Sequence, residues 1–167
     1  SVSALLAEDS ESNPALVLGA ALGATPGEYG IRDKIGIVAD GTSIVGFGDW
    51  AEQLIAESTG KLSKGVLPIV LNAQSAELTS GLADFLAVRV VEDATSARGD
   101  EVAVSGDLGA QFMLWEYATV IASRLIGINP FDQPDVESAK IAARAMLEQR
   151  DEIVAPLFAD AGIEVRY

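Results

Sequence analysis

The sequence has no cysteine and no histidine among its 167 residues. Without cysteine the chain can form no disulfide, and it has no thiolate to act as a nucleophile or a metal ligand. Without histidine it can supply no Ser-His-Asp triad, no imidazole acid–base catalyst and no zinc site built on histidine. Any acid–base catalysis by these residues must therefore come from Glu, Asp, Lys or Tyr.

Positive charge is also scarce, because 11 Lys and Arg residues stand against 25 Asp and Glu residues and the net charge is −14. Proteins that bind DNA or RNA need clustered Lys and Arg to displace counterions from the phosphates. The basic residues of this chain do not cluster, so we expect no nucleic-acid partner. An anionic ligand would need a local positive field made by helix N-termini and one or two lysines.

Long apolar runs are missing as well. No stretch of 18 or more apolar residues occurs, so we expect no membrane-spanning segment and no membrane partner. The N-terminus does not show the basic segment and apolar run of a signal peptide. With 49% hydrophobic and 22% charged residues, the composition is typical of a globular protein with a substantial core, and we expect a cytoplasmic one.

The alternation of apolar runs and capped helical segments predicts a three-layer α/β/α sandwich with a mainly parallel, five-stranded sheet. The predicted strands lie at residues 34–39, 66–71, 85–91, 101–104 and 162–167. The main predicted helices begin at Asn13-Pro14, at Asp49 and at Asp107, and the last spans residues 136–158. We expect this last helix to turn one apolar stripe inward, made of Val136, Ala139, Ala143, Met146 and Leu147. Residues 1–30 are expected to form a helical segment that packs on a domain of residues 31–167. In such folds ligands bind at the carboxyl ends of the strands.

Residues 49–61 form the segment on which the predicted function depends. Asp49 suits the N-cap of a helix, and Gly60 suits the position just past its end. Gln53 and Glu57 are four residues apart, so their side chains stand on one face of this helix. The negative end of the helix macrodipole disfavours the charged form of a carboxylate in the last turn, which suits a general base working near neutral pH. The alternative interpretation is a surface helix with a solvated Glu57.

Two segments carry a resemblance to a known family. Residues 52–61 read Glu-Gln-Leu-Ile-Ala-Glu-Ser-Thr-Gly-Lys, and residues 64–68 read Lys-Gly-Val-Leu-Pro. Residues 129–140 read Asn-Pro-Phe-Asp-Gln-Pro-Asp-Val-Glu-Ser-Ala-Lys, and the helical stretch 111–116 reads Gln-Phe-Met-Leu-Trp-Glu. In this order they resemble the signatures of glucose-6-phosphate isomerase. The Pro-Phe-Asp-Gln-Pro form is most similar to bacterial members, some of which are fused to a transaldolase.

The resemblance implies a fold and an activity. Members of the family contain two sugar isomerase (SIS) domains, and this chain is similar to the second. The resemblance places the first SIS domain, with its phosphate-binding loop, and the C-terminal remainder outside this chain, so we expect the chain alone to be inactive or weakly active. The family interconverts glucose 6-phosphate and fructose 6-phosphate through a cis-enediol, in glycolysis and gluconeogenesis, without metal or cofactor. The implied partners are a small sugar phosphate, the first SIS domain of the same enzyme and, in a homodimer, a second copy.

The resemblance also implies roles for four residues. Glu57 matches the base that moves a proton between C1 and C2, and Lys140 matches the lysine that assists near the ring oxygen and phosphate. Gln53 and Gln133 match glutamines that contact the substrate. The histidine that the family uses in ring opening has no counterpart in this sequence. Asp135 stands where many members have Gly, which is expected to reshape the turn before Lys140.

Other interpretations of these residues stay open. Lys140 is also compatible with a surface pair with Glu137, and Gln133 with a plain loop amide. Lys61 and Lys64 are expected to neutralise a helix end rather than to contact phosphate. For residues 40–43, Asp-Gly-Thr-Ser, a tight turn is favoured over an anion-binding loop. The two tryptophans, Trp50 and Trp115, are expected in the core.

Two other functions fit the same resemblance. One is a non-catalytic SIS module that binds a sugar phosphate, and the other is an isomerase for a different phosphosugar. Replacement of Glu57 in an intact enzyme separates a catalyst from a binding module, since only the catalyst has a rate to lose.

Overall fold

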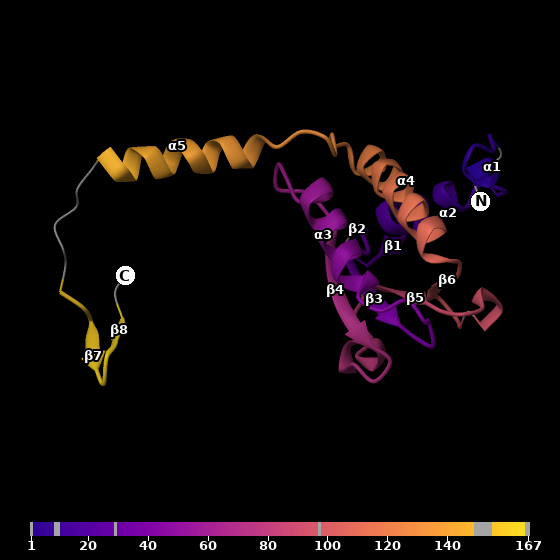
Figure 1. Cartoon of the computed structure of the whole chain (residues 1–167), viewed down its shortest axis with the longest axis horizontal. Coiled ribbons are helices and arrows are strands. Elements are labelled where there is room, and N and C mark those ends of the chain that lie inside the picture. The colour runs from indigo at the N-terminus through magenta and orange to yellow at the C-terminus, as the bar shows by residue number, and fades with distance from the viewer. Residues whose placement is uncertain (1, 9–10, 29, 97, 149–154, 166–167) are drawn as a thin grey trace. The chain divides into compact units, whose positions relative to one another are not determined.

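The computed structural model describes residues 2–8, 11–28, 30–96, 98–148 and 155–165 (Figure 1). The α-helices are α1 (Val2–Leu5), α2 (Pro14–Ala24), α3 (Phe47–Thr59), α4 (Leu108–Ile126) and α5 (Pro134–Glu148). The strands are β1 (Pro26–Gly27), β2 (Gly30–Ile31), β3 (Lys34–Ala39), β4 (Leu67–Asn72), β5 (Phe85–Val90), β6 (Val102–Val104), β7 (Phe158–Asp160) and β8 (Ile163–Val165). Two short 3-10 helices are η1 (Ala76–Thr79) and η2 (Ala94–Ser96).

Four strands form one parallel sheet in the order β4-β3-β5-β6. In this sheet Ile37 of β3 pairs with Val70 of β4 on one side and with Val88 of β5 on the other. Parallel strands need crossover connections, and α3 makes the first of these between β3 and β4. The α/β class and the parallel sheet are therefore confirmed, and β3 has the predicted bounds.

Helices α3 and α4 pack on the face of the sheet where the core lies. Ile37 and Val88 of the sheet belong to one buried cluster with Ile55 of α3 and Trp115 of α4, and each is at most 1% exposed. On the other face, Ala87 of β5 borders a groove together with residues of η1. The sheet with helices on its faces is the predicted three-layer α/β/α sandwich.

The predicted fifth strand does not join this sheet. Residues 163–165 form β8, which pairs antiparallel with β7, while residues 166–167 lie outside the described residues. By its contacts the chain divides into two compact units, residues 1–133 and residues 134–167. Strand β8 satisfies its backbone hydrogen bonds within the second unit, so the described parallel sheet has four strands rather than five. Residues 1–30, predicted as a helical segment that packs on the domain, belong to the first unit with the sheet.

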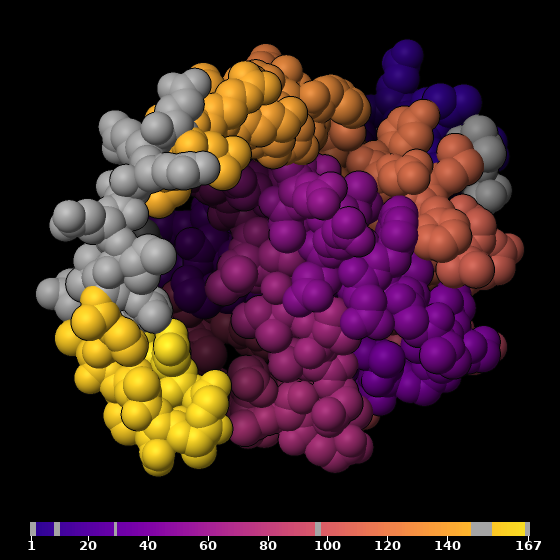
Figure 2. Space-filling model, turned by 60° about the vertical axis from the view of Figure 1, so that its left-hand side comes forward, coloured from indigo at the N-terminus to yellow at the C-terminus, as the bar shows by residue number. Residues whose placement is uncertain are grey.

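Helix α5 ends earlier than predicted and is exposed. Residues 149–154 lie outside the described residues, and Phe158 begins β7 instead of ending a helix. All side chains from residue 135 to residue 147 are exposed in α5, which is orange in Figure 2. The predicted inward stripe, which includes Met146 and Leu147, is therefore not buried. Apolar spacing determines which side chains share a helix face, but burial also requires a surface that covers this face.

Two predicted helix caps are confirmed. The side chain of Asn13 accepts hydrogen bonds from the backbone N–H groups of Ala15 and Leu16 at 3.0 and 3.3 Å. The side chain of Asp107 accepts one from Ala110 N–H at 2.9 Å, so α4 begins where predicted. No helix in the described ranges, α4 with its 19 residues included, is long and apolar enough to cross a membrane.

Glycines let α2 pack closely on α4. A Cβ at Gly19 would lie 2.6 Å from the side chain of Ile121, and a Cβ at Gly23 would lie 2.8 Å from Ala122 Cα. The neighbour of Gly23 is a backbone atom, which cannot rotate away as a side chain can. A Cβ at Gly19 would likewise lie 2.9 Å from the backbone oxygen of Ala118, so both glycines constrain the spacing of these two helices.

Replacement of Gly23 by Ala is expected to lower the free energy of unfolding by about 1–3 kcal/mol, because the added methyl group overpacks the contact with Ala122. The matched control is Gly109→Ala in α4, where the nearest atom to an added Cβ is 3.9 Å away. That variant is expected to gain up to ~1 kcal/mol from helix propensity. Urea unfolding of both variants measures the difference, and equal stability of the two would contradict the close packing of α2 on α4.

Candidate functional site

Helix α3 carries both Gln53 and Glu57, and it begins earlier than predicted. Gly46 occupies the N-cap position with a φ of 76°, a left-handed backbone conformation that glycine adopts without strain. Asp49, predicted as the N-cap, instead lies in the first turn, where its charge faces the positive end of the macrodipole. The end of the helix agrees with the prediction, since Gly60 is the C-cap residue.

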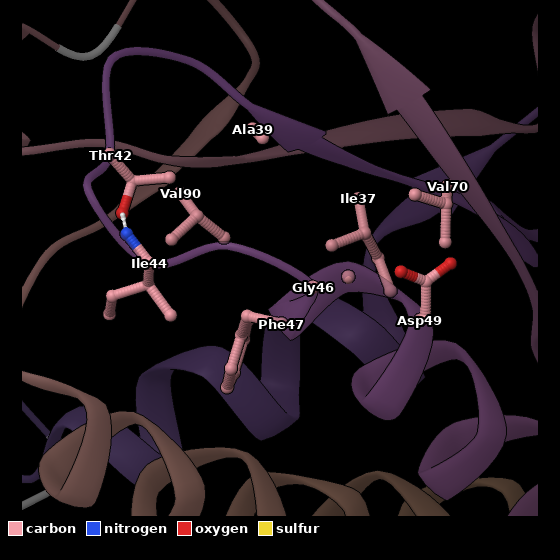
Figure 3. A pocket seen from close by; sticks show the side chains of 10 residues that line it. Ile37, Ala39, Thr42, Ile44, Gly46, Phe47, Asp49, Val70 and Val90 are labelled. Carbon is pink, nitrogen blue, oxygen red and sulfur yellow. Dashed lines mark hydrogen bonds between the residues drawn. The ribbon is translucent and has the colours of Figure 1, made fainter.

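The N-terminal end of α3 borders a small cavity at the carboxyl ends of the strands (Figure 3). Its volume is about 90 Å³, well below the roughly 300 Å³ at which ordinary ligand pockets begin. Apolar side chains such as Ile37 and Val70 dominate its lining, and the carboxylate of Asp49 is its charged group. A neighbouring groove is bordered by Glu92 and Asp107. These carboxylates make this end of the sheet unfavourable for an anionic sugar phosphate, although parallel sheets usually bind ligands there.

A buried arginine holds the start of the loop after β3, where the chain bends at residues 41 and 43 without the backbone hydrogen bond of the predicted tight turn. Within this loop Thr42 Oγ1 accepts a hydrogen bond from Ile44 N–H at 3.1 Å. Arg89 of β5 is 9% exposed, and its Nη1 donates a hydrogen bond to Asp40 at 3.1 Å. Its Nε and Nη2 both donate to the carboxylate of Glu101, and the bond from Nη2 to Oε1 is 2.8 Å long. The hydrogen bonds between them lower the pKa of Glu101 and raise the pKa of Arg89. Sequence reasoning missed this network, although a charged residue inside an apolar strand is a signal for a buried ion pair.

Gln53 and Glu57 lie on one face of α3, as predicted, and they are hydrogen-bonded to each other. Gln53 Nε2 donates to Glu57 Oε1 at 3.2 Å, and both side chains are exposed. Helix α3 runs from the carboxyl end of β3 back to the amino end of β4, so its last turn lies at the opposite end of the sheet from the cavity of Figure 3. A carboxylate held by an amide in this way can accept a proton from a molecule bound on this surface.

Residues 59–66 form a tightly closed turn after α3. The hydroxyl of buried Thr59 accepts from Val66 N–H at 3.0 Å and donates to Val66 O at 3.3 Å, which closes the base of the turn. At its tip Leu62 and Ser63 have φ values of 55° and 56°, in the left-handed region that non-glycine residues rarely adopt. Two such residues in succession are the requirement of a type I′ turn. The rest of the turn therefore has to hold them in this conformation.

Lys61 and Lys64 flank the tip of this turn and bind main-chain carbonyl groups. Lys61 is 4% exposed, and its Nζ donates to three carbonyls, those of Asn129 at 3.3 Å, of Pro130 at 3.2 Å and of Asp132. The Nζ of Lys64 donates to Ile126 O at 3.2 Å and to Gly127 O at 3.5 Å, at the C-terminal end of α4. Lys64 does lie at a helix end, but this is the end of α4 and not of α3, the helix that these lysines follow. Lys61 has a different role, which sequence reasoning missed.

The loop of residues 129–133 carries Gln133 and is held by its own side chains as well as by Lys61. Asn129 Oδ1 accepts from Phe131 N–H at 3.1 Å, and Asp132 Oδ1 accepts from Gln133 N–H at 2.9 Å. The side chain of Gln133 is exposed. Lys61 therefore joins the helix that carries Glu57 to the loop that carries Gln133, which brings parts of both resembling segments together.

Lys140 lies on the exposed helix α5 in the second unit. Its Nζ is 3.9 Å from Glu137 Oε2, and the side chains are 59% and 62% exposed. This is the geometry of the surface pair that the sequence left as an alternative. Such exposed pairs contribute little to stability, so Lys140 is available for other partners.

Trp115 lies in the core of the first unit, as predicted, whereas Trp50 is only half-buried and packs against that core. Trp115 is 0% exposed, and Trp50 meets Phe112 edge to face with ring centroids 4.5 Å apart. Across the described ranges, no three Asp or Glu side chains are grouped so that they could hold a metal ion.

No family model matches this chain, and a search of curated proteins finds no match to it.

Proposed function

We propose that this chain provides the second SIS domain of a glucose-6-phosphate isomerase. The observation that supports the proposal most is the contact between the two resembling segments. Lys61, at the end of the first segment, binds three carbonyls of the loop that opens the second. Segments distant in the sequence that contribute to one site have to pack together, and the first segment does pack on residues 129–132 of the second.

The proposed reaction gives a role to each of the four residues. The Glu57 carboxylate removes the proton from C2 of open-chain glucose 6-phosphate while O1 takes up a proton from a group outside this chain, which gives a cis-enediol. Glu57 then returns its proton to C1 while O2 loses its proton to that outside group, which gives fructose 6-phosphate. Gln53 orients Glu57 through the bond at 3.2 Å and, with Gln133, contacts the sugar hydroxyls. Lys140 supplies positive charge near the ring oxygen and the phosphate. The ring-opening acid and the main phosphate contacts come from outside this chain.

A non-catalytic sugar-phosphate-binding module is the second candidate. It is favoured by the exposure of Gln53, Glu57 and Gln133, since an open surface gives a reacting carbon no protection from water. In the proposed isomerase this protection would come from the first SIS domain.

The experiment is an isomerase assay on the longest natural reading frame that contains this sequence, called the full-length enzyme below. Fructose 6-phosphate is supplied, and the glucose 6-phosphate formed is detected through its dehydrogenase. We expect turnover by the full-length enzyme and little or none by the 167-residue chain. Binding of fructose 6-phosphate without turnover would favour the binding module. Turnover of another phosphosugar in a substrate panel, without turnover of this one, would change the assigned substrate.

A further inference from the structure

Lys61 is a buried lysine whose ammonium group donates hydrogen bonds to main-chain carbonyls and not to a carboxylate. It is 4% exposed, and it takes part in no ion pair among the residues described here. An ammonium group has three N–H donors and no acceptor, and burial is costly unless each donor is satisfied. Three carbonyls, those of Asn129, Pro130 and Asp132, satisfy them. An apolar residue in its place would leave these carbonyls without this donor.

The loop is folded around the ammonium group. Its carbonyls at residues 129, 130 and 132 converge on Lys61, while Phe131 is 81% exposed and the side chain of Gln133 is also exposed. The chain thus turns polar backbone groups inward, and Phe131 and Gln133 are among the side chains that it presents outward. A cation that binds several carbonyls from neighbouring residues fixes the backbone of the loop much as a bound metal ion would.

The group that carries Lys61 is itself well anchored. Thr59 and Val66 close the base of the turn by two hydrogen bonds, and Lys61 N–H donates to Thr59 O at 2.9 Å. Lys64 N–H donates to Lys61 O at 3.0 Å across the tip. The turn is therefore a rigid extension of α3, and a position fixed relative to the turn is fixed relative to Glu57.

We infer that Lys61 is a positioning residue of the proposed isomerase site, in which its ammonium group holds loop 129–133 so that Gln133 has a set place relative to Glu57. This inference rests on the proposed function. Lys61 touches no substrate in this role, and it acts through Gln133. Misplacement of a substrate-contacting group by about 1 Å is enough to lower a rate by roughly 10²-fold.

The test compares Lys61→Met with Lys61→Arg and Lys64→Met in the full-length enzyme. Met preserves the length of the side chain without its donors, Arg keeps the charge and several donors, and Lys64→Met alters the same turn without a loop contact. We expect Lys61→Met to lower kcat by about 10²-fold with a much smaller change in KM. Lys61→Arg should recover part of the loss, and Lys64→Met should keep kcat within about threefold of the wild type, because a surface lysine contributes little.

Two further measurements separate positioning from general destabilisation. Hydrogen exchange at Phe131 and Gln133 N–H should become faster in Lys61→Met and not in Lys64→Met. The effects of Lys61→Met and Gln133→Ala on kcat should be strongly non-additive, because one acts through the other. Should Lys61→Met fold poorly, it is made together with Leu62→Asn and Ser63→Gly, which suit the type I′ turn and offset the stability loss.

The possible outcomes test the positioning role of Lys61 separately from the proposed function. An unchanged kcat in Lys61→Met with an active wild type, or additive effects with Gln133→Ala, would overturn the positioning role and leave the proposed function standing. An inactive wild-type full-length enzyme would overturn the proposed function and with it the positioning role. Faster exchange in Lys61→Met together with a lower kcat and rescue by arginine is the expected result.

Discussion

Glu57→Gln in the full-length enzyme is expected to lower kcat for fructose 6-phosphate by about 10³-fold, since a positioned general base contributes roughly 10²–10⁴-fold. Gln has nearly the same shape as Glu but cannot take a proton from carbon. Its carbonyl oxygen can still accept the hydrogen bond that Gln53 donates to Oε1 at 3.2 Å. Because residue 57 is exposed, the free energy of unfolding should change by no more than about 0.5 kcal/mol.

The measurement is a steady-state assay with KM determined alongside kcat. KM should change little, because the variant keeps the shape and most contacts of the bound state. Glu52→Gln on the same helix is the matched control and should keep nearly full activity. If Glu57→Gln kept kcat within a factor of about three, Glu57 would not be the base and the proton transfer would need another group.

Arg89→Met is expected to lower the free energy of unfolding by about 3 kcal/mol, the largest stability effect that we predict. Arg89 is 9% exposed and neutralises both Glu101 and Asp40. Removal of the guanidinium group leaves these partly buried carboxylates without their shared hydrogen-bonded counterion, while Met fills most of the vacated volume. The same loss frees the start of the loop after β3. Urea unfolding at neutral pH measures the effect.

The effect of Arg89→Met should also depend on pH. Hydrogen bonds from Arg89 hold the pKa of Glu101 below its ordinary value, so the carboxylate form stabilises the folded state. This stability is fully present above the unfolded-state pKa of Glu101 and is lost as the pH falls through the lower, folded-state pKa. The difference between wild type and variant should therefore be largest near neutral pH and shrink in acid. A difference that does not change with pH would contradict this assignment. Lys34→Met, which removes half-exposed ion pairs with Asp84 at 2.7 Å and with Asp33 at 2.8 Å, is the control and should have a much smaller effect.

Local patterns predicted the regular elements of the first unit well. Asn13 and Asp107 cap their helices as expected, because an N-cap depends on the few backbone groups beside it. The apolar run at residues 34–39 became β3, since a short buried run between turn signals has few other structures open to it. Gln53 and Glu57 share a face because the helical repeat alone requires it. These features follow from residues within a turn or two of each other.

Other features depended on partners that are distant in the sequence. The apolar stripe of α5 was expected to be inward, yet Met146 and Leu147 are 75% and 83% exposed, because periodicity does not supply the covering surface. The segment 163–165 has the composition of a sheet strand, but it pairs with β7 instead of extending the parallel sheet. In both cases the sequence pattern predicted the kind of element, helix or strand. The partners of that element in the folded chain could not be predicted from the pattern.

For the candidate site, the sequence by itself predicted which residues would carry the chemistry: a carboxylate and an amide on one helix face, and a second amide and a lysine in a later segment. The tertiary structure decided that the last turn of α3 and loop 129–133 come together, and that Lys61 joins them. No pattern could have shown this, because Lys61 binds main-chain carbonyls. Every residue has such a carbonyl, so only the path of the backbone determines which three of them meet the charge.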